Sequence, residues 1–152
     1  MARLRLRGDR LRLARETVNL SREDVAQALG LSSAARVRLW ETGLETPRPR
    51  LVPKLAKVLT VDPLHLLDAD PEDPPLVALR IAAGKATTDM VAPGMSVMTY
   101  VRLEDGRSTI DPPGEVIEQL GTLLSAPPTL VRAAIKRSRR DNEAAVLSLI
   151  HI

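Results

Sequence analysis

The sequence has no cysteine and very few aromatic residues, and each absence limits what the protein can be. Without cysteine the chain can form neither a disulfide nor a thiolate metal site, and two histidines are too few for a histidine-based site. Phenylalanine is missing, and Trp40 and Tyr100 are the single residues of their types. The core must therefore be aliphatic, and the scarcity of alternating apolar residues argues against strands. We expect no metal and no cofactor.

Long apolar runs are also missing. No stretch approaches the roughly 18 apolar residues that cross a bilayer, and no basic segment followed by an apolar run indicates a signal peptide. The sequence offers no nucleophile–histidine–acid set and no phosphate-binding glycine loop, so we do not expect an enzyme. These absences predict a soluble, cytoplasmic protein without a membrane partner.

Charge is distributed unevenly along the 152 residues. Residues 1–57 hold 13 Lys and Arg against 6 Asp and Glu, a net charge of +7, whereas residues 58–152 carry a net charge of −4. A basic first third beside an acidic remainder suggests a polyanion-binding part. The alternative is an ordinary solvated helix face.

Apolar residues recur mostly at helical spacing, which predicts an all-α protein. Ser21, followed by acidic residues, is typical of a helix N-cap, and Gly30 ends that helix. Ser33 is the next expected N-cap, with Val37 and Trp40 on one face of the helix that follows. Two short helices are then expected at residues 51–59 and 62–67.

The remaining segments complete the predicted organisation. Residues 1–7 are either a first helical turn or a loose arm lying on phosphates. An acidic, proline-rich composition makes residues 68–75 a linker. A second helical domain follows at residues 76–137, and the region 138–152 holds a charged break at 138–141 and an apolar helix from 142. That helix either packs on the second domain, which we favour, or forms a dimer seam.

The arrangement around Gly30 satisfies the geometry of a helix-turn-helix. Ala26 is small enough to let the second helix cross closely, and Gly30, four residues later, permits the turn. Residues 8–67 resemble the lambda-repressor-like (XRE-type) helix-turn-helix DNA-binding family. One departure is a turn that we interpret as one residue longer, because Ser33 stands three residues after Gly30 rather than two. The resemblance is carried by residues 11–16, 21–26, 29–32, 40–43, 55–59 and 61–63.

The resemblance implies a five-helix domain that binds double-stranded DNA and reads it with the third helix. Positions one, two and five after the N-cap are then Ala34, Ala35 and Arg38. Arg38 would pair with guanine, and the alanines would offer only methyl contacts. Other expected DNA contacts, mostly to phosphate or the groove edge, are Arg22, Ser32, Ser33, Arg36, Arg48 and Arg50.

Residues 76–137 repeat the pattern in altered form. Gly94, Ser96, Tyr100, Leu103, Glu104 and Gly106 echo Gly30, Ser33, Val37, Trp40, Glu41 and Gly43. The copy is altered at its expected helix 87–92 and at its reader positions, which are apolar. We therefore favour a pairing or partner-binding role over a second DNA reader. The face concerned comprises Ser96, Val97, Met98, Val101, Arg102 and Arg107.

Two functions follow from these features. The first is a transcriptional regulator, more specifically a repressor, that is cytoplasmic, of bacterial or phage type and nucleoid-associated. The alternative is a protein-interaction module, such as an antitoxin or partner-holding regulator, in which DNA binding is secondary. On DNA the chain is expected either as a homodimer on a partly palindromic site or as a tandem-domain monomer on an asymmetric one.

Overall fold

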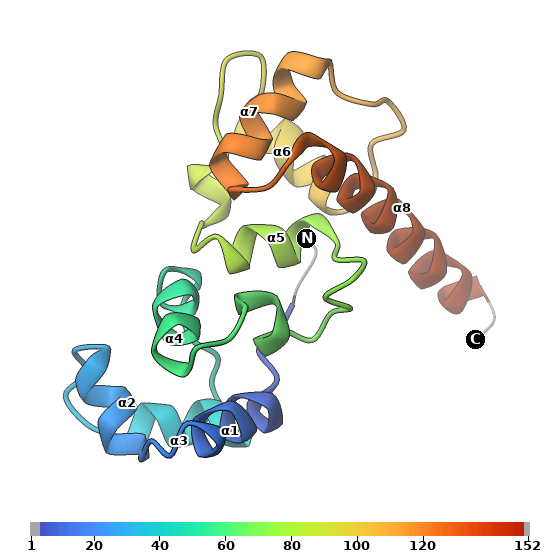
Figure 1. Ribbon diagram of the computed structural model, residues 1–152. Coiled ribbons are helices and arrows are strands. Elements are labelled where there is room, and N and C mark those ends of the chain that lie inside the picture. Colours follow the sequence, from blue (N-terminus) through green and yellow to red (C-terminus); the bar gives the residue numbers. More distant parts are fainter. Residues whose placement is uncertain (1–3, 151–152) are drawn as a thin grey trace.

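In the computed structural model, which describes residues 4–150, all regular elements are helices, and only two isolated backbone bridges resemble strand pairing (Figure 1). The all-α expectation is confirmed for this part of the chain. The elements are α1 (Gly8–Thr17), α2 (Arg22–Ala28), α3 (Ala35–Thr42), η1 (Pro49–Leu51), α4 (Val52–Leu59), η2 (Pro63–Leu66), α5 (Leu76–Ala82), η3 (Thr87–Asp89), α6 (Val97–Glu104), α7 (Gly114–Leu124) and α8 (Pro128–Ile150).

The N-terminal half, residues 4–67, encloses its own aliphatic core around Leu11, Val25, Leu55 and Trp40. Local sequence sets the ends of its helices. Ser21 accepts a hydrogen bond from the Asp24 amide, and Asp24 accepts one from the Ser21 amide, which gives α2 the expected N-cap. The hydrogen bond from the Ser21 amide to the Asp24 carboxylate is the main reason why the pKa of Asp24 is lowered.

The segment before α1 packs on the protein. Leu6 is buried and pairs with Leu67 in an antiparallel bridge, the Arg7 amide donates to Leu66 O, and the Asp68 amide donates to Arg5 O. Residues 4–7 are therefore neither a helical turn nor a loose arm, and the expectation for them was wrong. Main-chain hydrogen bonding to residues 66–68 overrides the pattern of alternating arginines, because the apolar Leu6 gains burial there. Residues 1–3 lie outside the described part.

The C-terminal half, residues 76–150, has a second core built on Leu76, Tyr100, Leu120 and Val131. Two sequence expectations fail here. The predicted helix at 87–92 is reduced to the single 3₁₀ turn η3, and Pro93 and Gly94 follow it. The predicted break at 138–141 is absent, because α8 continues without interruption to Ile150.

Hydrogen bonds explain why α8 does not break. The Ser138 hydroxyl donates to Ala134 O inside the helix, and Arg137 pairs with Asp141 one turn later at 2.8 Å. The charges that suggested a break are spaced to stabilise a helix.

The two halves pack directly on each other. Val52 and Leu67 of the first half and Ala78 of α5 form a small cluster in which each is at most 1 % exposed. The connecting residues 68–75 hold no helix, but Pro74 and Pro75 are buried. None of the helices in the described part of the chain is long and apolar enough to span a membrane.

Candidate nucleic-acid interface

Helix α3 has one buried and one solvent-facing side. Val37 is fully buried and Trp40 is 2 % exposed, so both anchor the helix to the core of the N-terminal half. Arg36 and Arg38 are both exposed and lie on the two flanks of this buried side, because residues two apart are about 200° apart around a helix. No part of residues 4–150 covers these arginines, so a ligand can reach them there.

The helix starts one residue later than expected, at Ala35, with Ala34 in the N-cap position. Ser33 still contributes to the helix start, because its hydroxyl accepts a hydrogen bond from the Ala35 amide at 3.3 Å. Ser32, Ser33 and Ala35 are exposed and Ala34 is half-buried. The predicted reader positions therefore lie in the first turns of α3 and the turn before it.

Basic residues continue beyond α3. Arg48 and Arg50 are exposed in and just before η1, and Arg22 is half-buried at the start of α2. Within residues 4–150, no hydrogen bond or ion pair engages the guanidinium groups of Arg36, Arg38, Arg48 and Arg50. Arginines without a protein partner keep their donors for an anion such as a phosphate.

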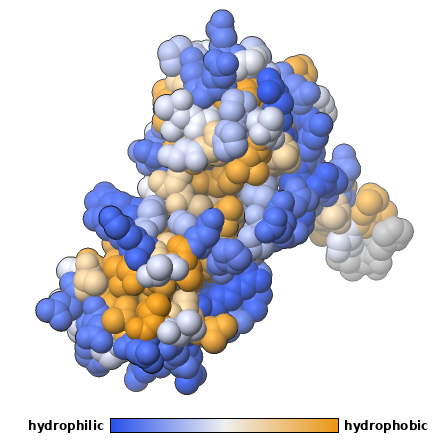
Figure 2. All heavy atoms as spheres, in the orientation of Figure 1, coloured by the Kyte–Doolittle hydropathy of each residue, from blue (hydrophilic) through white to orange (hydrophobic). Residues whose placement is uncertain are grey.

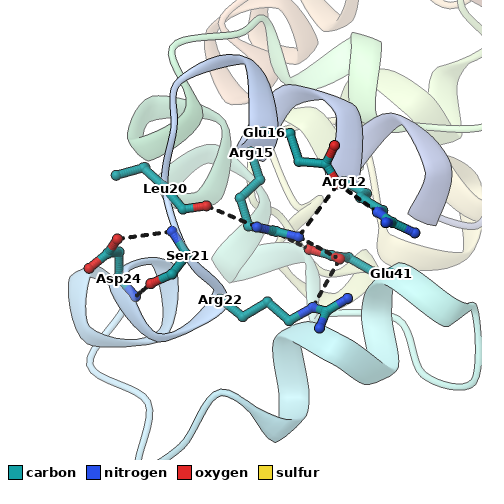
Figure 3. Close-up of polar contacts among 8 residues, drawn as sticks. All are labelled: Arg12, Arg15, Glu16, Leu20, Ser21, Arg22, Asp24 and Glu41. Carbon is teal, nitrogen blue, oxygen red and sulfur yellow. Dashed lines mark hydrogen bonds and ion pairs between the residues drawn. The ribbon is translucent and has the colours of Figure 1, made fainter.

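A buried carboxylate holds the three helices together behind this surface (Figure 3). Glu41 of α3, whose side chain is 2 % exposed, accepts from Arg15 Nε of α1 at 2.6 Å and from Arg22 Nε of α2 at 3.1 Å. Arg15 also donates to Leu20 O in the loop between α1 and α2, and its bond to Glu41 raises its pKa. This arrangement fixes the angle at which α3 leaves α2.

Sequence reasoning did not predict that role for Arg15 and Glu41. The signal was present, since Glu41 and Glu104 each stand two residues before a glycine and one after a large apolar residue. Arg22, which was expected against phosphate, donates from its Nε to Glu41, and 36 % of its side chain is exposed.

The same polar contacts recur in the C-terminal half. Arg80, 65 positions after Arg15, donates from Nε to Glu104 Oε1 at 2.6 Å and from Nη1 to Lys85 O at 3.0 Å. Both donors and both kinds of acceptor match those of Arg15, although the described halves share few identical residues. Tyr100 adds a hydrogen bond from its hydroxyl to Glu104.

The helix that follows η3 exposes an apolar side. Ser96 caps α6 by accepting from the Thr99 amide, as expected. Met98 is 63 % exposed, Val97 and Val101 are half-buried, and Arg102 and Arg107 are exposed. Basic side chains therefore border this face rather than cover it.

A family model described as "Helix-turn-helix domain" matches residues 8–69. This segment is a helix-turn-helix domain of the lambda-repressor type. The match covers the three helices joined through Glu41, so α2 and α3 are the pair that gives the family its name. A search of curated proteins and a search of solved structures found no match. A domain of this kind is typical of DNA-binding regulators, and the match suggests DNA as a partner.

Proposed function

We propose that the protein is a repressor that recognises a specific double-stranded DNA sequence by placing α3 in the major groove. The observation that carries the proposal is the two-sided α3 of a helix-turn-helix domain. Val37 and Trp40 fix one side in the core. On the flanks of that side, Arg36 and Arg38 present guanidinium groups that have no partner among residues 4–150. A helix that carries exposed basic side chains fits the major groove of DNA in size and in charge.

Each exposed residue has a distinct role in this proposal. Arg38 pairs with guanine O6 and N7 through two donors. Arg36 reaches a phosphate or the groove edge, and the first-turn residues Ala34 and Ala35 let the helix approach the bases closely. Phosphate contacts by the remaining residues fix the register of the domain on the duplex: Arg22, Ser32, Ser33, Arg48 and Arg50.

The C-terminal half is proposed as a divergent second copy that holds a protein rather than DNA. The repeated Arg–Glu geometry supports duplication, since Arg15 with Glu41 and Arg80 with Glu104 have the same donors and acceptors. Two features argue against DNA reading by this half. The helix before α6 is a single 3₁₀ turn, and the outward side of α6 is apolar around Met98. A nucleoid-associated protein of bacterial or phage type fits this combination.

The test begins with a DNA motif selected from a random pool and measured again with Arg38→Ala. We expect the variant to lose about 1–3 kcal/mol of discrimination at one base position, or roughly 5- to 150-fold. Arg132→Ala is the matched control, because Arg132 is also an exposed arginine but lies on α8. An unchanged motif in the Arg38 variant would show that this residue does not read a base.

Phosphate contacts are tested separately by salt. Arg48→Ala should weaken binding to all sequences alike and reduce the slope of log affinity against log salt by about 1. Indifference of the protein to duplex DNA at low salt, together with tight capture of a partner protein, would favour the interaction-module function instead.

A further inference from the structure

The last turns of α8 project beyond the rest of the described chain (Figure 1). The last hydrogen bond that ties this helix to the rest of its half joins Asn142 Nδ2 to Gly106 O. Beyond it, in the α8 end (residues 143–150), Val146, Leu147, Leu149 and Ile150 are 48 %, 55 %, 70 % and 69 % exposed. The preferred expectation, packing on the second domain, was therefore wrong for this segment. Figure 2 shows apolar surface on this projecting end.

An open apolar groove lies on the N-terminal half. It has a volume of about 700 Å³ and runs between α1 and the segment that joins α4 to η2; this groove is called the α1 groove below. Leu13, 67 % exposed, and Val18 line one wall, and Leu59 and Val61 line the other. None of its lining residues belongs to α2 or α3. Occupation of the α1 groove thus leaves the proposed DNA-reading side free.

The corresponding face of the C-terminal half is already covered. Pairing Arg15 with Arg80 places Leu13 of α1 at the position of Ala78 of α5, which is fully buried. Ala78 packs against Val52 and Leu67 of the N-terminal half. Leu64 of the same half packs against the C-terminal core as well. Apolar side chains from outside the unit therefore cover this helix face in one half, and the equivalent face on α1 has no cover.

Covering the exposed apolar side chains of the α8 end and of the groove is favourable in water. A specific interface buries roughly 1,200–2,000 Å² in total. Each chain carries both the apolar helix end and the groove. In a two-fold dimer the helix end of each chain can therefore fill the groove of the other, so the contact forms twice and no groove stays open. No residue of α8 lines the α1 groove of its own chain, so the described α8 end does not fill it.

We propose that the protein forms a two-fold homodimer in which the α8 end of each copy docks in the α1 groove of the other. The occupant is an amphipathic helix in an apolar groove, anchored against Leu13 by Val146, Leu149 and Ile150, which share one face of α8. The contact does not depend on DNA, so its failure and the failure of DNA reading give different results.

Because the chain has no cysteine, pairs of introduced cysteines report the contact directly. Leu13→Cys and Leu149→Cys chains are mixed and oxidised, and we expect a disulfide between the two different chains, since the bond requires close Cα atoms. Ile110→Cys replaces Leu13→Cys as the control, because Ile110 is also a large apolar residue and is 79 % exposed, but it lies in the loop between α6 and α7 instead of on α1. That mixture should give no specific product.

Mass in solution completes the test. The unmodified protein without DNA should have twice the chain mass, and Leu149→Asp should convert it to the monomer while its helical circular dichroism stays unchanged. Three results would overturn the proposal: a monomeric unmodified protein, a Leu149→Asp variant that remains dimeric, or cross-linking of Leu149→Cys chains to one another in preference to Leu13→Cys chains. The last would indicate pairing of the α8 ends.

Discussion

Replacing Arg15 by methionine leaves the Glu41 carboxylate without its main partner in a place where only 2 % of the side chain is exposed. Removing one member of a buried ion pair costs about 3–5 kcal/mol, because the remaining charge is desolvated and uncompensated. Arg22 still contacts Glu41, but it is 36 % exposed and its contribution is screened by water. We therefore expect a loss of about 3 kcal/mol in the free energy of unfolding.

For a chain of this length, a loss of that size lowers the melting temperature by roughly 6–12 °C. The double variant Arg15→Met with Glu41→Leu should recover most of the loss, because a well-packed apolar pair replaces the ion pair at similar volume. DNA affinity should fall in the single variant even under conditions where it is folded, because Glu41 sets the angle of α3.

Urea unfolding followed by fluorescence measures the effect, since Trp40 is the single tryptophan and is buried beside Glu41. Circular dichroism reports both halves in the same titration. Arg12→Met is the control, because it breaks an exposed pair with Glu16 on the same helix and should change stability little. Equal effects of the Arg12 and Arg15 variants would refute the reasoning that burial makes the Glu41 contact costly to break.

Two further perturbations test the C-terminal half. Tyr100→Phe removes the hydroxyl that donates to buried Glu104 and should cost about 1.5–3 kcal/mol in urea unfolding; a loss below 0.5 kcal/mol would contradict the buried bond. Burial raises the pKa of Tyr100 above its ordinary value of 10. The free energy of unfolding should therefore fall above pH 10, by up to about 1.4 kcal/mol for each pH unit, because the unfolded state loses the phenol proton first. The fall should be smaller in the phenylalanine variant. Gly43→Ala and Gly106→Ala both place alanine at positive φ, which should lower the free energy of unfolding by about 1–2 kcal/mol. Only at Gly106 would the new Cβ overlap the backbone carbonyl of Ser138, so its melting temperature should fall further; equal shifts would refute this packing.

Local signals in the sequence were enough to predict much of the helix-turn-helix domain. The cap at Ser21, the glycine at 30 and the spacing of Val37 and Trp40 act within one or two turns, so their consequences can be read without knowing the fold. The first turn of α3 was predicted one residue early, because Ala34 and Ser33 compete for the cap position and the backbone chooses between them. Continuity of α8 was missed because charges on one helix face resemble a polar break.

By itself the sequence determined that the protein is helical, that its cores are aliphatic and that a basic helix follows Ser33, since composition and period depend on neighbouring residues alone. Only the tertiary structure decided that Arg15 and Arg22 meet Glu41, that Ala78 is covered while Leu13 is open, and that the apolar side chains of the α8 end are exposed. These outcomes depend on contacts between residues far apart in sequence. Burial and pairing of that kind follow from how helices cross, which no local pattern specifies.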